Sequence, residues 1–376
     1  MSIAYIPQTV KIRLWGKAAG RCEYDGCLER LWLDSLTKFE FNVAYIAHII
    51  ADKPNGPRGH PTLSRGLNCD ISNLMLLCDR HHRLVDKEDV LGHPVERLRA
   101  MKQSHEQRME VLTGISLHKQ SHVILYGANI GELSSPVSYA KALSAMTPDW
   151  YPAETTPITL GMANSSFEDS SEEYWQIESA HLKNRFLQQI RPRIAQGELT
   201  HLSVFALAPQ PLLILLGTLL SDIPEVEVYQ LHREPADWQW RDHTRDIEFI
   251  VHEPDASLGP PALAISLSAT VTDDRITSLF ESRVAVWRLT IPEPHNDFLE
   301  SKHQARQFRE TARRLLNTIK ARHGEQSRLH VFPVMPAALA VEFGRILAPK
   351  ADLPLAVYDQ HKLRGGFALA FNLNDG

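Results

Sequence analysis

Two short pairs of soft metal ligands stand near the start of the sequence: Cys22 with Cys27, and Cys78 with His81. At these spacings each pair can reach one tetrahedral ion, and zinc suits cysteine and histidine best. All four cysteines of the chain fall in the first 80 residues, a distribution that argues against a disulfide scaffold and favours metal binding in a reducing compartment. We therefore predict a structural zinc site; the alternative is that the cysteines are buried as small hydrophobic residues. Cys69 has no obvious partner and is expected in the core.

Three segments around these ligands carry further polar side chains: residues 47–50 include His48, residues 72–78 include Asn73, and residues 81–86 include His82 and Asp86. In this order, and joined to zinc pairs, they resemble the HNH endonucleases over about residues 20–90. The resemblance implies an α+β fold with a ββα-metal unit, in which a histidine ends the first strand, an asparagine occupies the turn and metal ligands lie on the helix. It implies His48, Asn73 and His82 as catalytic residues, with Asn73 orienting the base by a hydrogen bond.

The chemistry of phosphodiester hydrolysis explains these residue types, because it needs a base to activate water and a cation to neutralise growing charge. His48 is the candidate base. If His82 and Asp86 lie on a helix, their spacing of four places both on one face, and they are the candidate ligands of Mg²⁺ or a similar divalent ion. His81 would point about 100 degrees away around that helix, which assigns it to zinc.

The position before the candidate base departs from the resemblance. Many HNH enzymes have an Asp or His there as a metal ligand, whereas this chain has Ala47. The catalytic ion must then be bound by fewer protein groups, by other residues or by the DNA phosphate itself. Asp86, Asp70 and His60 are the candidates to compensate, and Asp86 is preferred. The plainer interpretation of a single histidine here is a hydrogen-bonded residue at a strand end.

Length and composition fit a multidomain globular protein. A chain of 376 residues suggests two or three domains, and 43% apolar with 23% charged residues is typical of soluble proteins. No stretch approaches the ~20 apolar residues of a membrane span, and the start lacks the pattern of a signal peptide, so we expect a cytoplasmic protein without a membrane partner. Residues 1–115 carry 16 Lys and Arg against 14 Asp and Glu, while residues 116–376 carry 24 against 31. Nucleic acid should therefore meet the N-terminal part.

The first domain is expected over residues 1–115. Residues 41–50 place Phe41, Val43 and Tyr45 on one face, as in a half-buried strand. Gly and Pro gather in a loop over residues 51–66, and the helical spacing of residues 95–112 predicts a helix that closes the domain.

The second domain, residues 116–376, alternates apolar strand-like runs with helical segments, which predicts an α/β class with a largely parallel sheet covered on both faces. Residues 201–233 repeat in residues 329–362, with Pro209 matching Pro336 and Gly217 matching Gly344 at a constant offset of 127. Each copy predicts a strand, a Pro-containing turn, a helix and a strand. This is the half-unit of a nucleotide-binding fold, duplicated.

The segments 203–222, 228–233, 236–240 and 331–359 resemble the SAVED sensor domain, over about residues 120–376. The resemblance implies an α/β domain made of two CARF-like, Rossmann-type units. An HNH domain fused to SAVED is the layout of effector nucleases in CBASS anti-phage systems. That layout implies a cyclic di- or trinucleotide as activator, assembly into a homo-oligomer on activation, and degradation of double-stranded DNA in abortive infection.

Candidate ligand-binding residues lie at the turns after the first strand of each repeat and near the following strands. Helix N-termini there would face phosphates, basic residues would supply charge, and tryptophans could stack on bases. Each residue has a plainer role as a turn, core or surface residue. The candidates are Pro209, Gln210, Arg233, Trp238, Trp240, Met335, Pro336, Tyr358 and Lys362.

Two alternatives remain open for the whole chain. In the first, the zinc knuckles dock on DNA and the nucleotide sensor controls transcription without nuclease activity. In the second, a nuclease restricts modified DNA, and the C-terminal part recognises the modification. A ligand-activated HNH-type endonuclease is preferred, because an unregulated active site of this kind would damage the host's own DNA.

Overall fold

The chain folds as two compact units, residues 1–116 and 117–376, so the division falls beside the boundary expected at 115. The computed structural model describes residues 5–131, 137–162, 167–221, 223, 225–241, 246–255, 259–361 and 365–373. The elements of the first unit are α1 (Gln8–Lys17), β1 (Tyr45–His48), α2 (Leu63–Gly66), η1 (Ile71–Asn73), β2 (Leu74–Leu77), α3 (Asp79–Arg83), η2 (Leu84–Glu88) and α4 (Val95–Thr113).

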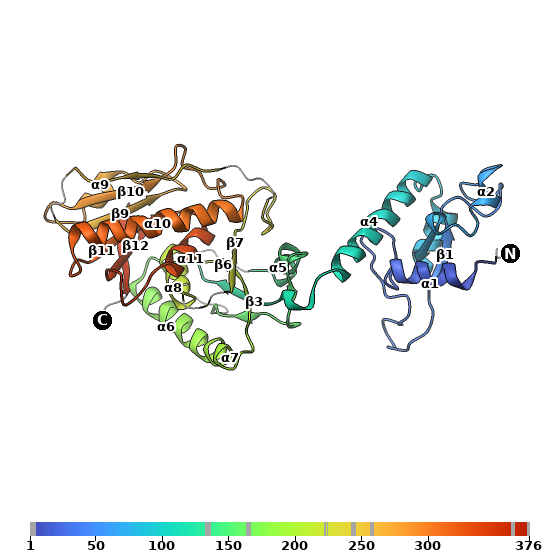
Figure 1. Ribbon diagram of the computed structural model, residues 1–376, viewed down its shortest axis with the longest axis horizontal. Coiled ribbons are helices and arrows are strands. Elements are labelled where there is room, and N and C mark those ends of the chain that lie inside the picture. The colour runs from blue at the N-terminus through green and yellow to red at the C-terminus, as the bar shows by residue number, and fades with distance from the viewer. Residues whose placement is uncertain are drawn as a thin grey trace. The chain divides into compact units, whose positions relative to one another are not determined.

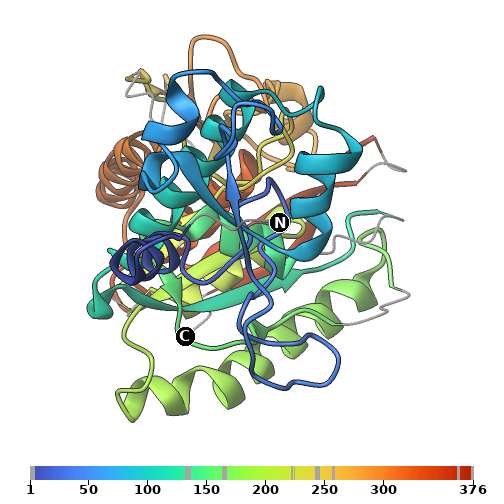
Figure 2. The same ribbon diagram turned by 90° about the vertical axis from the view of Figure 1, so that its right-hand side faces the viewer.

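A short antiparallel hairpin forms the centre of the first unit. β1 pairs with β2 from Tyr45 opposite Leu77 to His48 opposite Leu74, and all four residues of β2 are buried. Apolar side chains of α1 and of the first turns of α4 complete this core. Figure 2 faces the unit and shows α1 nearly end-on beside the hairpin. The helix predicted over 95–112 is confirmed within one residue.

The strand predicted over residues 41–50 is shorter than expected. It spans only Tyr45–His48, although Phe41 and Tyr45 are about half-buried as expected, with exposures of 49% and 43%. The strand is short because β1 pairs only with the four-residue β2, while the residues before it bond elsewhere: the Phe41 N–H donates to the Trp32 carbonyl and the Val43 N–H to the Leu31 carbonyl. Full burial begins at Ala47 and Ile49.

The second unit contains two sheets joined by the packing of helices. Its elements are η3 (Leu117–Lys119), β3 (Gln120–Gly127), α5 (Tyr139–Met146), β4 (Tyr151–Pro152), β5 (Ile158–Thr159), α6 (Glu172–Gln189), α7 (Arg191–Ala195), β6 (Leu202–Leu207), α8 (Gln210–Leu219), β7 (Val226–Tyr229), β8 (Ile250–His252), β9 (Pro261–Ser266), α9 (Asp273–Thr277), β10 (Ala285–Thr290), α10 (Lys302–His323), β11 (Leu329–Val334), α11 (Ala337–Arg345), β12 (Leu355–His361) and β13 (Gly366–Leu373).

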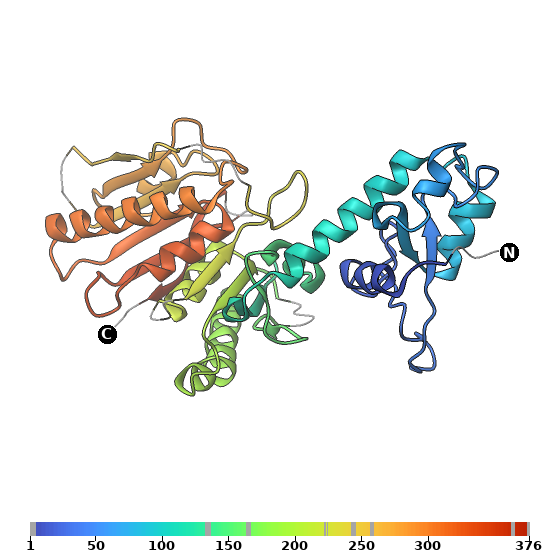
Figure 3. The same cartoon turned by 45° about the vertical axis from the view of Figure 1, so that its right-hand side comes forward.

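Strand pairing gives each half of the duplication its own sheet. The first has the order β4-β3-β6-β7, with β5 also paired to β3, and its pairings are parallel. The second has the order β13-β12-β11-β9-β10-β8, in which the edge strands β8 and β13 run antiparallel to a parallel centre. The largely parallel arrangement is as predicted, but it is divided between two sheets. In the second sheet α10 and α11 cover one face, and α9 packs against the other (Figures 1 and 3).

The predicted internal repeat is present as β6-α8-β7 and β11-α11-β12. Both helices start after a proline with nearly the same backbone angles, φ −54° and ψ 144° at Pro209 and φ −56° and ψ 147° at Pro336. The two helices pack on each other at the matched glycines. A Cβ on Gly217 would lie 2.7 Å from the Gly344 Cα, and a Cβ on Gly344 would lie 2.8 Å from the Gly217 Cα. The duplication therefore places equivalent residues face to face.

Within the described part of the chain, no helix combines the length and the apolar character that crossing a bilayer requires.

Candidate functional site

The two predicted pairs of zinc ligands meet in the first unit. The ligand atoms of Cys22, Cys27, Cys78 and His81 all lie within 4.8 Å of one another. The His81 Nδ1 is 3.2 Å from the Cys78 Sγ and 3.7 Å from the Cys22 Sγ. Around a tetrahedral zinc, two ligand atoms of this kind are separated by about 3.6–3.8 Å. These side chains therefore match the size and chemistry of a zinc site.

Neighbouring groups orient these ligands. The Tyr24 ring stacks on the His81 ring with centroids 4.0 Å apart, and the Tyr24 hydroxyl contacts the His93 Nε2 at 3.0 Å. The Cys78 backbone N–H points at the Cys22 Sγ at 3.4 Å. Burial raises the pKa of the Cys22 and Cys78 thiols, so a cation is needed to hold them as thiolates near neutral pH. Cys69 lies apart and is only partly buried, with its Sγ on the Tyr5 carbonyl.

The candidate base His48 ends β1 and has a defined tautomer. Its Nε2 lies 2.9 Å from the carbonyl oxygen of Asn68. A carbonyl oxygen can only accept a hydrogen bond, so the Nε2 carries the hydrogen. In the neutral ring the Nδ1 then keeps its lone pair, which is the state that a general base needs.

Asn73 has a structural position different from the one expected. Its side chain is 1% exposed, and its amide forms a two-way clamp on Ile50, accepting from the backbone N–H at 2.8 Å and donating to the carbonyl at 2.9 Å. It also donates to the Leu67 carbonyl at 3.2 Å. The expected hydrogen bond to His48 is replaced by the one from His48 to Asn68. Asn73 thus fixes the chain directly after His48, because a buried amide is satisfied most fully by backbone groups.

His82 and Asp86 lie together on the helical segment that follows β2. The His82 Nε2 is 3.4 Å from one carboxylate oxygen of Asp86, and the His82 ring stacks on Tyr45 of β1 with centroids 4.7 Å apart. Burial lowers the pKa of His82, partly offset by the Asp86 charge, so the ring is neutral at pH 7. Adjacent His81 points into the cysteine cluster instead, so the structure separates the two histidines as the helical geometry predicted.

The sequence reasoning missed Arg58, a residue of the loop between β1 and α2. Its guanidinium is 6% exposed and pairs with the second carboxylate oxygen of Asp86 at 2.5 Å. It also donates to the Ile49 carbonyl at 2.8 Å and the Val85 carbonyl at 2.6 Å. The available signal was the glycine on either side of Pro57-Arg58, which marks a tight turn.

The two other candidates to replace the ligand missing at Ala47 are engaged locally. Asp70 accepts from the Ser72 backbone and hydroxyl, and the His60 Nδ1 accepts from the Thr62 backbone N–H. Among the residues that the structure describes, the three cysteines with His81 form the only group of three or more potential ligand atoms that come together. A second ion would therefore have few protein ligands.

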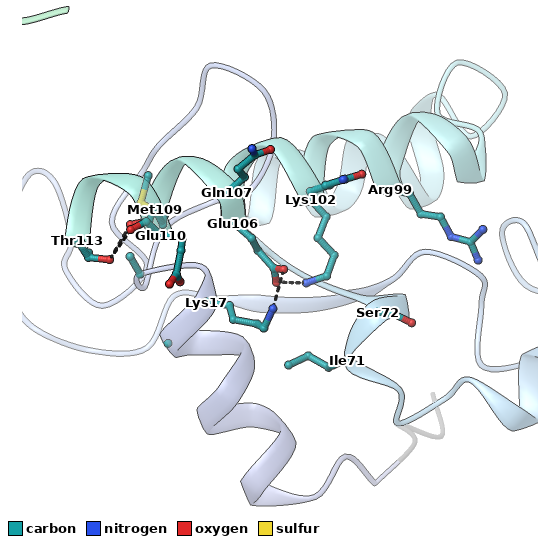
Figure 4. Close-up of a pocket in the computed structure, with 13 residues that line it drawn as sticks. Lys17, Ile71, Ser72, Arg99, Lys102, Glu106, Gln107, Met109, Glu110 and Thr113 are labelled. Atoms are coloured by element: carbon teal, nitrogen blue, oxygen red, sulfur yellow. Dashed lines mark hydrogen bonds and ion pairs between the residues drawn. The ribbon is translucent and has the colours of Figure 1, made fainter. Parts of the chain in front are cut away.

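A pocket of about 840 Å³ lies elsewhere in the first unit, between the end of α1, η1 and α4 (Figure 4). Two of its lysines are neutralised within the unit. Lys17 and Lys102 both donate to Glu106, at 3.2 and 2.5 Å, and Lys102 is also 3.7 Å from buried Glu23. The dashed lines of Figure 4 show how Glu106 sits between the two ammonium groups. The pocket contains none of the predicted site residues.

In the second unit, the predicted turns of the two repeats meet through one side chain. The Gln210 amide donates to the Met335 carbonyl at 3.0 Å and accepts from the Met335 backbone N–H at 3.2 Å. Gln210 begins α8, whereas Met335 lies just before α11, so this clamp joins the two helix N-termini. Pro209, Met335 and Pro336 are buried beside it. The starts of two helices therefore lie together here, and the positive end of a helix dipole favours an anionic ligand.

Residues 182–373 match the family model described as the SMODS-associated and fused to various effectors sensor domain, SAVED. The chain belongs to the SAVED family. Its SAVED region thus includes both copies of the repeat, and the sensor expected from the sequence is confirmed. A search of curated proteins found no match.

Solved structures similar to the chain include two of the Acinetobacter baumannii Cap4 SAVED/CARF-domain containing receptor, one with the cyclic trinucleotide 2'3'3'-cAAA and one with 3'3'3'-cAAA. Both are 14% identical with a TM-score of 0.44, and the matches cover 74% and 78% of this chain. The Moraxella osloensis Cap4 receptor is 12% identical with a TM-score of 0.38. The chain spans 55% and 60% of the length of the first two.

The remaining ligand-binding candidates of the SAVED region occupy varied positions. Arg233 is exposed, whereas Trp238 is buried edge-on against Phe205 in a core cluster. Trp240 is half-buried, and Tyr358 stacks on Phe332. Lys362 lies outside the described residues. The structure brings together the four turn residues Pro209, Gln210, Met335 and Pro336 through the Gln210 clamp.

Proposed function

We propose that this chain is an effector nuclease whose first unit hydrolyses phosphodiester bonds of double-stranded DNA when its SAVED region binds a cyclic di- or trinucleotide. The observation that carries the proposal is the state of His48. Its Nε2 is held by the Asn68 carbonyl, which leaves the Nδ1 lone pair as a base, and it ends the strand that packs against the helical segment with His82 and Asp86.

The residues have distinct parts in the proposed reaction. His48 takes a proton from water at its Nδ1, and the resulting imidazolium is oriented by the Asn68 carbonyl. Asn73 fixes the chain after His48 through its clamp on Ile50, so the base has one orientation. The cysteine cluster ties the start of α3 to the Cys22 loop, which holds the helical segment in place.

A divalent ion such as Mg²⁺ fits this site as a weakly held partner. His82 and the Asp86 oxygen facing it offer one nitrogen and one oxygen, and such ions commonly retain several waters and bind substrate phosphates. When bound there, it would neutralise charge on the phosphate that is attacked. The absence of a third protein ligand at Ala47 predicts ion affinity that depends strongly on the presence of DNA.

Activation is assigned to the SAVED region, because the family is a sensor domain fused to effectors. The Gln210 clamp joins the N-termini of α8 and α11, so a ligand that contacts both helix N-termini would bind a single composite site. Negatively charged phosphates of a cyclic oligonucleotide suit such a site. Cleavage of both DNA strands would then follow from bringing two first units together in a homo-oligomer.

Plasmid cleavage tests the proposal. Purified protein with Mg²⁺ is expected to fragment a supercoiled plasmid only when an activating member of a panel of cyclic di- and trinucleotides is added, and His48→Ala should abolish fragmentation while keeping the zinc. His60→Ala, which removes a histidine engaged in local capping, is the matched control. DNA binding without cleavage under every nucleotide would instead identify a regulator.

A further inference from the structure

Arg58 joins the two halves of the proposed nuclease site through one guanidinium. On the strand side it donates to the Ile49 carbonyl at 2.8 Å and approaches the His48 carbonyl at 3.4 Å. On the helical side it donates to the Val85 carbonyl at 2.6 Å and pairs with Asp86 at 2.5 Å. The side chain is 6% exposed, so these contacts take place away from competing water.

The backbone conformation of the loop between β1 and α2 directs the Arg58 side chain inward. Arg58 has φ +55°, a left-handed conformation that is unfavourable for any residue with a Cβ. A Cβ on Gly56 would lie 2.6 Å from the Ala51 Cβ, and one on Gly59 would lie 2.2 Å from the Pro54 carbonyl oxygen. Both glycines are therefore required for the turn to close on itself. A strained, tightly closed turn is expected where a particular placement matters.

We propose that Arg58 is a positioning residue of the nuclease site, which locks the end of β1 with His48 onto the segment with His82 and keeps one Asp86 oxygen aimed at His82. This inference rests on the proposed function. Asp86 has one oxygen on Arg58 and the other 3.4 Å from the His82 Nε2. Without Arg58 the carboxylate can rotate, and His82 loses its fixed partner.

The shape of the guanidinium explains why this position takes arginine. Its donors form a rigid planar fork that reaches several acceptors at once, whereas lysine has a single flexible ammonium. The acceptors here come from four residues, two before the loop and two 27 and 28 positions after Arg58. Lysine can keep the ion pair with Asp86 but cannot bridge strand and helix together.

The test compares Arg58→Met and Arg58→Lys with wild type, and uses Arg65→Met, an exposed arginine of α2, as control. With the activating nucleotide, kcat for plasmid cleavage should fall roughly 10- to 100-fold in both Arg58 variants, while KM changes little. Losses of this size are typical of residues that hydrogen-bond to metal ligands and orient them. Zinc content should stay at the wild-type level. Arg65→Met should cleave like wild type.

Protein that keeps its zinc but is measured without Mg²⁺ gives a readout that does not depend on catalysis. Ring ¹⁵N NMR signals of His82 should show one fixed tautomer in wild type and an average of two in Arg58→Met, while those of His81 stay unchanged. The activity losses of Arg58→Met and Asp86→Asn should be non-additive in the double variant, because both remove the ion pair between Arg58 and Asp86. Arg58→Lys keeps a charge opposite Asp86, so it remains informative if Arg58→Met fails to fold.

Three results separate the possible failures. Wild-type kcat together with an unchanged His82 tautomer in folded Arg58→Lys would overturn the role of Arg58 and leave the nuclease intact. Additive losses in the double variant would also overturn it. A wild-type protein that never cleaves DNA would refute the proposed function, and the His82 NMR signals would then still decide whether Arg58 orders the site.

Discussion

Substituting alanine for Gly217 tests whether the two SAVED repeats pack through their matched glycines. The new Cβ would lie 2.1 Å from the Val341 carbonyl oxygen, 2.7 Å from the Gly344 Cα and 2.9 Å from the Arg345 backbone nitrogen. All three are backbone atoms, so relief requires α8 and α11 to move apart by about 1 Å. Overpacking of this kind costs roughly 3 kcal/mol, and replacing a helical glycine by alanine returns about 1 kcal/mol. We expect a net loss of about 2 kcal/mol.

Calorimetry of the intact chain measures this change. A loss of about 2 kcal/mol should lower the Tm of the second unit by roughly 4–8 °C. Gly16→Ala in α1 is the control, because its Cβ would meet no atom within 4 Å, and only the stabilising helix term remains. An unchanged or raised Tm in Gly217→Ala would refute the close crossing of the two helices. Gly344→Ala should behave like Gly217→Ala, since its Cβ would lie 2.0 Å from the Ile214 carbonyl oxygen.

Three further outcomes are expected. Cys22→Ser should lose bound zinc and unfold the first unit, as shown by metal analysis and circular dichroism, while Cys69→Ser keeps its zinc; equal zinc in both would contradict the cluster. Burial is the main cause that lowers the pKa of His201 from its usual 6.5 to about 4, and the charges of Lys119 and Lys302 add to it. The contribution of neutral His201 to the free energy of unfolding is therefore complete above pH 6.5. About 3 kcal/mol of it is lost as the pH falls toward 4. Urea titrations at pH 7 and 4.5 should show this loss in wild type and a smaller one in His201→Gln. Gln210→Ala removes both hydrogen bonds to Met335 and should weaken binding of the activating nucleotide roughly 5- to 30-fold by titration calorimetry; unchanged affinity would separate the clamp from the binding site.

The spacing of residues along the sequence was sufficient to predict features that lie within a single element or that recur in a repeat. The pairs Cys22 with Cys27 and Cys78 with His81 were predictable, since close spacing lets the two ligands of a pair reach one ion, and the structure brings both pairs together. Helical geometry also separated His81 from His82. The repeat at an offset of 127 was readable because duplicated units keep the same strand, turn and helix.

Contacts between distant segments were decided only by the tertiary structure. The sequence suggested a hydrogen bond from Asn73 to His48, but the fold brings Asn68 to His48 and Ile50 to Asn73. The spacing of residues does not predict the ion pair between Arg58 and Asp86, because it depends on how the turn with Gly56 and Gly59 closes.

The two short pairs of metal ligands and the duplicated sensor were therefore determined by the sequence itself, because each pair is set by local spacing and each repeat by its own elements; the meeting of the two pairs was decided by the fold. The tautomer of His48, the place of Arg58 and the division of the parallel strands into two sheets were decided by folding, since each depends on which buried polar groups and apolar faces find partners across the chain.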